Sequence, residues 1–189
     1  MTCIVGMVEG EKVYIGGDSV GVAGYEADVR ADAKVFRNGP MIFGFTSSFR
    51  MGQLLRYSLV VPQRHPETDV YAWLVTTFID AVRACLDRGG YSRRVNGEEE
   101  AGTFLIGYAG RLFAVQDDYQ VAEVARSYQA VGCGATYALG ALHATDARSA
   151  AYVLGQRLDP ILRLTIALGA ASEHSAGVRG PYRFEILEG

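Results

Sequence analysis

Residues 2–19 read TCIVGMVEGEKVYIGGDS, and this stretch indicates how the chain folds. Apolar residues occupy both sets of alternate positions at its start: Thr2, Ile4, Gly6 and Val8 on one side, Cys3, Val5 and Met7 on the other. A strand with two apolar faces is covered on both sides in the folded protein. Residues 9–11 then form a turn and residues 12–15 return, which predicts an antiparallel hairpin.

The rest of the chain alternates runs of strands with runs of helices. Further strands are expected over 33–36, 41–45, 103–108, 111–115 and 182–187, with at least one more within 121–131. Helices are expected from Ser47 or Ser48 to about Val61, from Thr68 or Asp69 to about Asp87, and over 136–144, 146–157 and 159–171. The remaining glycine-rich and charged stretches, 16–24 and 88–100, read as loops. Segregated runs of this kind predict an α+β protein, with two sheets facing each other and helices outside both, in one domain over residues 1–189.

The overall composition excludes several classes of protein. The chain has 189 residues with 18 Lys and Arg against 21 Asp and Glu, a net charge of −3. It is too apolar to be disordered and lacks the basic excess that nucleic-acid binding requires. No apolar run approaches the roughly 20 residues that span a bilayer. We therefore expect no nucleic-acid partner and no membrane association.

The thiol and imidazole groups are few and scattered. The cysteines are Cys3, Cys85 and Cys133, with no CxxC motif and no histidine at the spacing of zinc ligands. We expect no metal and no cofactor, and this cysteine usage fits a reducing, cytoplasmic compartment. The N-terminal segment has no basic region before its apolar residues, so it does not read as a signal peptide.

Thr2 is the residue with the most chemical information, because it directly follows Met1. Removal of Met1 would place a hydroxyl and a free α-amine on one residue. An α-amine has a pKa of about 7.7–8.0, so it can accept the proton of its own hydroxyl and later return it to a leaving amine. Such a site requires neither a histidine base nor a metal ion.

Beginning at Thr2, the chain resembles a known family, the proteasome β-subunits and the bacterial HslV-type peptidases. These are N-terminal nucleophile (Ntn) hydrolases with an N-terminal threonine. The matching segments run in order along the chain: TCIVG at 2–6, GGDS at 16–19, AKV at 33–35, GFTS at 44–47, LIGY at 105–108, LFAV at 112–115, AVGCGATYA at 130–138 and SAG at 175–177. The steps from Thr2 to Asp18 and from Asp18 to Lys34 are both sixteen residues, as in the family. The resemblance implies the four-layer α-β-β-α sandwich of Ntn hydrolases and a threonine protease activity.

The resemblance also implies roles for individual residues. Thr2 would be the nucleophile, with Lys34 as an ammonium beside it and Asp18 paired with that lysine. The list of catalytic candidates is completed by the Ser47 N–H as oxyanion donor, Cys133 and Ser175. Three positions depart from the family pattern: Ser47 replaces a glycine, Cys133 a serine and Ser172 an aspartate. A serine at position 47 is strained if its φ is positive, and a thiol is a weaker hydrogen-bond donor than a hydroxyl.

The substrate groove follows from the same resemblance. Gly21 and Val22 fall where the family binds peptide backbone as an added strand. Near the side-chain pocket fall Asp32, Phe45 and Phe49. The two phenylalanines favour apolar substrate side chains, whereas Asp32 could admit a basic one.

The implied assembly is a homo-oligomeric ring that encloses the nucleophiles and receives unfolded protein from an ATP-driven unfoldase. Two other functions remain open from the sequence. One is a non-catalytic ring or scaffold subunit, which would be favoured if Met1 were retained. The other is an Ntn amidohydrolase that acts on a small-molecule amide.

Overall fold

The computed structural model describes residues 1–95, 97–146 and 158–189 and places most strands in two antiparallel sheets. The first sheet has the order β12-β1-β2-β13, formed by Tyr128–Gly132, Cys3–Glu9, Lys12–Gly17 and Arg183–Leu187. The second has the order β11-β10-β9-β6-β5, formed by Val121–Glu123, Arg111–Val115, Phe104–Tyr108, Met41–Phe45 and Val35–Asn38. Two small ribbons complete the strands: β3 (Val20–Ala23) with β4 (Glu26–Val29), and β7 (Arg93–Val95) with β8 (Glu98–Glu100).

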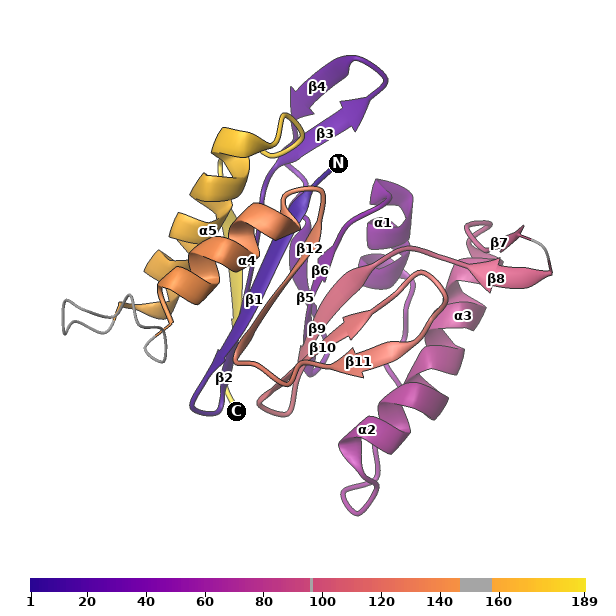
Figure 1. The fold of residues 1–189 in the computed structure, drawn as a ribbon. Helices are drawn as coiled ribbons and strands as arrows, with labels where there is room; N and C mark the ends of the chain where they lie inside the picture. Colours follow the sequence, from indigo (N-terminus) through magenta and orange to yellow (C-terminus); the bar gives the residue numbers. More distant parts are fainter. Residues whose placement is uncertain (96, 147–157) are drawn as a thin grey trace.

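Helices lie on the outer face of each large sheet (Figure 1). On one side are α4 (Ala135–Ala144) and α5 (Pro160–His174). On the other are α1 (Phe49–Tyr57) and a continuous helical segment made of α2 (Val70–Trp73), the π-helical turn η1 (Leu74–Phe78) and α3 (Ile79–Arg88). The expected α+β class with antiparallel sheets is confirmed.

Strand β1 is buried on both faces, as its sequence predicts. Cys3, Val5 and Met7 belong to the apolar cluster that α4 and α5 share with the first sheet. Ile4 belongs to the cluster between the two sheets. At Gly6 a β-carbon would come within 2.9 Å of Leu112, so the sheets approach each other closely there. This packing buries β1 between the helices α4 and α5 on one side and the second sheet on the other.

Three predicted loops or boundaries were wrong. Residues 20–29 form the β3–β4 ribbon, and part of 88–100 forms the β7–β8 ribbon. Helix α1 ends at Tyr57 rather than near Val61. The reason is tertiary: the side-chain amide of Asn38 donates to the carbonyl oxygens of Leu55 and Leu59, which closes the end of the helix.

Other boundaries differ less. Helix α5 continues three residues past the expected end, to His174. Its start follows the sequence, because the carboxylate of Asp159 caps the helix by accepting the N–H groups of Ile161 and Leu162. Most of the helix expected over 146–157 lies outside the described residues. Among the described residues, no helix combines the length and apolarity needed to cross a bilayer.

Candidate active site

Asp18 directly follows β2 and is fixed by backbone donors. One carboxylate oxygen accepts the N–H of Cys3 at 2.9 Å, and the other accepts the N–H of Val20 at 3.0 Å. The side chain is fully buried. A buried carboxylate requires such donors and a cation, because its desolvation is otherwise very costly.

Lys34 supplies that cation and connects Asp18 to Thr2. It directly precedes β5, and its side chain is 1% exposed. Its Nζ lies 2.9 and 3.0 Å from the two carboxylate oxygens of Asp18 and 2.9 Å from Oγ1 of Thr2. The two sixteen-residue steps of the sequence thus end in one hydrogen-bonded group of three side chains.

Burial and the carboxylate of Asp18 shift the pKa of Lys34 in opposite directions. Burial lowers the pKa of Lys34, and the charge of Asp18 opposes this effect. The lowered pKa makes the ammonium a better proton donor to an oxygen that develops negative charge. The thiol of Cys3, one residue from Thr2, is held protonated, because burial followed by the charge of Asp18 raises its pKa to about 12.

The backbone of Thr2 is held by the end of β12. Its carbonyl oxygen accepts the N–H of Gly134 at 3.4 Å. Gly132 has φ 99°, and a β-carbon there would lie 2.2 Å from that carbonyl oxygen. Only glycine permits this approach, so residue 132 contributes to the position of Thr2 although it has no side chain.

The nitrogen of Thr2 is a peptide nitrogen in the chain that carries Met1. Its N–H donates to Sγ of Cys133 at 3.3 Å, and the hydroxyl of Thr2 donates to the carbonyl oxygen of Met1. Cys133 is exposed, and its Sγ lies 3.3 Å from Oγ of Ser175, the C-cap of α5. Cys133 therefore contacts the nitrogen of Thr2, and Ser175, predicted from a distant segment, contacts Cys133.

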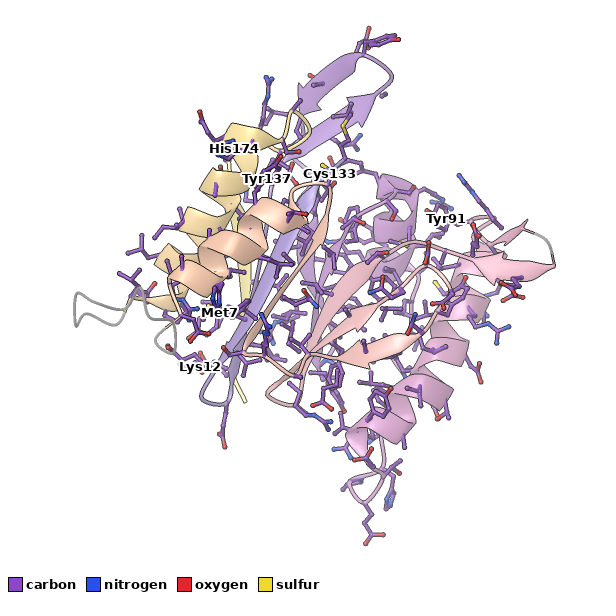
Figure 2. All side chains as sticks on the ribbon, in the orientation of Figure 1. Met7, Lys12, Tyr91, Cys133, Tyr137 and His174 are labelled. Atoms are coloured by element: carbon purple, nitrogen blue, oxygen red, sulfur yellow. The ribbon has the colours of Figure 1, made fainter. Side chains whose placement is uncertain are left out.

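Ser172 and His174 lie near Ser175 in the chain but make contacts elsewhere. Ser172 donates to the carbonyl oxygen of Val178 at 3.0 Å and so braces the loop after α5. The ring of His174 lies against that of Tyr137, with centroids 5.1 Å apart. Figure 2 shows both rings at the same end of the molecule as Cys133.

Ser47 has a positive φ of 66°, which strains a residue with a side chain. Its hydroxyl accepts the N–H of Thr103 at 3.2 Å, which helps to hold this conformation. Among the described residues, no hydrogen bond uses the N–H of Ser47. This N–H is therefore available to an acceptor near the cavity that Ser47 and Thr2 both line.

A cavity of about 40 Å³ lies beside Thr2. Its walls include Val22, Phe45 and Phe49, three of the expected groove residues, together with residues 46–48 and Met1. Gly21 lies in β3, where a β-carbon would meet Arg30 and Phe49. Asp32 is not among the lining residues, and Arg30 binds both of its carboxylate oxygens.

The described residues hold no cluster of three or more histidine, cysteine or acidic side chains that could bind a metal ion.

No family model and no curated protein matches the sequence. Solved structures do match. BPH from Thiobacillus denitrificans, solved in complex with epoxomicin, has a TM-score of 0.79 and 21% identity over 99% of this chain and 98% of its own. HslV from Trypanosoma brucei has a TM-score of 0.67 and 18% identity, with both chains fully covered. Anbu (ancestral beta-subunit) from Yersinia bercovieri has a TM-score of 0.63 and 15% identity over all of this chain and 82% of its own.

These likenesses show the fold. The chain has the fold of HslV, BPH and Anbu, which confirms at the level of fold the resemblance seen in the sequence motifs.

Proposed function

We propose that the protein is a threonine peptidase of the proteasome and HslV kind, with Thr2 as its nucleophile. The observation that carries this proposal is the position of Nζ of Lys34, 2.9 Å from Oγ1 of Thr2 and anchored on both oxygens of Asp18. A buried cation held against a hydroxyl lowers the pKa of that hydroxyl. The stacking of helices, sheet, sheet and helices supports the four-layer Ntn-hydrolase arrangement.

The proposed reaction requires removal of Met1, which converts the nitrogen of Thr2 into an α-amine. This amine then accepts the proton of the Thr2 hydroxyl as its oxygen attacks the carbonyl carbon of the substrate. Lys34 stabilises the developing charge on the attacking oxygen. The N–H of Ser47 binds the oxyanion of the tetrahedral intermediate.

The intermediate collapses by breaking the bond between the carbonyl carbon and the leaving nitrogen. The leaving amine takes the proton from the α-ammonium of Thr2, and an ester remains on the threonine oxygen. Water then hydrolyses this ester with the α-amine again as base. Cys133 contacts this nitrogen and Ser175 contacts Cys133, so we assign both to its positioning.

We further propose that the chain works in a homo-oligomeric ring that receives unfolded protein from an ATP-driven unfoldase, in the cytoplasm. The support is the shared fold with HslV and with Anbu, an ancestral beta-subunit. Enclosure within a ring would keep the nucleophile away from folded cellular proteins.

The test uses protein purified from its native host. Intact mass is expected to show loss of Met1, and an epoxyketone peptide is expected to label Thr2, because its two electrophilic carbons react with a hydroxyl and an amine on one residue. The Thr2→Ala variant should keep its assembly state and lose both labelling and peptide cleavage. Retained Met1 together with absent cleavage would overturn the proposal in favour of a non-catalytic ring subunit.

A further inference from the structure

Thr46, which the sequence does not single out, connects Ser47 to the second sheet. Strands β6 and β9 are neighbours in that sheet, with Phe45 opposite Phe104 (Figure 1). The pairing continues by one residue, because the N–H of Thr46 donates to the carbonyl oxygen of Thr103 at 3.0 Å. Residue 46 is therefore still held by the sheet, and the chain leaves the sheet at Ser47.

The hydroxyls of Thr46 and Ser47 form a ring of hydrogen bonds that begins and ends at Thr103. The hydroxyl of Thr46 donates to the carbonyl oxygen of Thr103 at 3.2 Å, and the N–H of Thr103 donates to Oγ of Ser47 at 3.2 Å. The two hydroxyl oxygens lie 3.1 Å apart. A hydroxyl has one hydrogen to donate. Since Thr46 uses its hydrogen on the carbonyl oxygen, Ser47 is the donor between the two hydroxyls.

Gly102 leaves room for this ring of hydrogen bonds. A β-carbon at residue 102 would lie 2.6 Å from Cβ of Ser47 and 2.8 Å from its Oγ. It would also lie 3.0 Å from Sδ of Met51 in α1. The side chain of Ser47 is therefore enclosed between the backbone of residue 102 and the hydroxyl of Thr46, which restricts its rotation.

The positive φ of Ser47 and the direction of its N–H depend on the same rotation. If the peptide group between Thr46 and Ser47 turned over, φ of Ser47 would become negative, and the strain that a side chain meets at 66° would be relieved. The same rotation would reverse the direction of the N–H of Ser47. It would also break the 2.7 Å hydrogen bond from the N–H of Ser48 to the carbonyl oxygen of Thr46. A residue with a side chain at position 47 therefore keeps this N–H in place only if other contacts resist the rotation.

We propose that Thr46 is a positioning residue of this site: its hydroxyl, acting through the hydroxyl of Ser47, resists rotation of the peptide group between them and keeps the N–H of Ser47 directed at the oxyanion. The inference rests on the proposed peptidase function, in which this N–H stabilises the tetrahedral intermediate. Thr46 acts through Ser47 and transfers no proton in the reaction.

The test measures kcat and KM of Thr46→Val on a fluorogenic peptide. Valine keeps the shape of the side chain but removes the hydroxyl, so the hydroxyl of Ser47 loses its acceptor. We expect kcat to fall by about tenfold, because the oxyanion donor is no longer held in one orientation. KM and the pH dependence of kcat should not change, because the α-amine of Thr2 is unaffected. Thr46→Ser retains the hydroxyl and should keep kcat within about twofold of the wild-type value.

The Ser47→Gly background separates this role from a merely structural one and from direct contact of Thr46 with the substrate. Glycine adopts a positive φ without steric cost, so the peptide group no longer depends on the hydroxyls. Addition of Thr46→Val to Ser47→Gly should therefore lower kcat by less than about twofold. Thr165→Val is the matched control: the hydroxyl of Thr165 donates to the carbonyl oxygen of Ile161 in α5, and its loss should leave kcat unchanged.

Failure of this inference and failure of the proposed function give different results. An unchanged kcat in Thr46→Val, a tenfold loss in Thr46→Ser, or an equal loss from Thr46→Val in the wild-type and Ser47→Gly backgrounds would overturn the role of Thr46. Wild-type cleavage that depends on Thr2 would then still support the peptidase. Absence of any cleavage that depends on Thr2 would overturn the peptidase, and with it the inference.

Discussion

Replacement of Lys34 by methionine tests both the stability and the chemistry of the site. The substitution keeps a long unbranched side chain and removes the only cation that contacts the buried carboxylate of Asp18 within the described residues. Removing one partner of a buried ion pair costs about 3–5 kcal/mol, because the other charge stays buried. The urea midpoint should therefore fall by roughly 1 M or more.

The effect on turnover follows from the distance to the nucleophile. At 2.9 Å from Oγ1 of Thr2, a unit charge stabilises a full negative charge by about 6 kcal/mol at an effective dielectric constant of about 20. The transition state carries part of that charge, so we expect kcat to fall by roughly two to four orders of magnitude. Circular dichroism in urea measures the stability, and a fluorogenic peptide measures kcat, with Thr2→Ala giving the background.

Two controls separate the two effects. Lys34→Met combined with Asp18→Asn should regain part of the stability, because the amide oxygen can still accept the N–H of Cys3, but it should not regain turnover. Lys12→Met removes an exposed ion pair with Glu188 and should change neither quantity. Undiminished turnover in Lys34→Met would refute the role of this lysine.

Three other predictions concern the surroundings of the nucleophile. Gly132→Ala should abolish turnover, because its β-carbon would meet the carbonyl oxygen of Thr2. Gly10 also has a positive φ, but a β-carbon there would have no atom within 4 Å, so Gly10→Ala should affect stability alone. Equal activity losses of the two variants in a peptide assay would contradict this prediction. The free energy of unfolding of Ser47→Gly should exceed that of Ser47→Ala by about 1 kcal/mol, because only glycine relieves the strain of the positive φ. Urea unfolding measures this difference, and the reverse order would show that residue 47 is not strained. Iodoacetamide at neutral pH should alkylate the exposed Cys133 and block turnover. It should spare Cys3, because burial raises the pKa of that thiol to about 12. Peptide mapping by mass spectrometry measures the modification of both thiols, and modification of Cys3 before Cys133 would be inconsistent with the structure.

The sequence by itself determined the α+β class of the fold. Strand β1 is readable because alternate residues point to opposite faces, so two apolar faces indicate burial on both sides. The resemblance of the ordered motifs to a known family, including its two sixteen-residue steps, implied that Thr2, Asp18 and Lys34 belong together.

Only the tertiary structure decided the contacts and the local conformations. The end of α1 depends on the side chain of Asn38, and the conformation of Ser47 is held by a hydrogen bond from Thr103, both distant in sequence. The charge of Asp32 is likewise neutralised by Arg30, which lies close in sequence but is aligned by β3 and the ring of Phe49. Packing between separate segments determines which partner each polar group binds, and the periodicity of apolar residues along the chain carries no information about these partners.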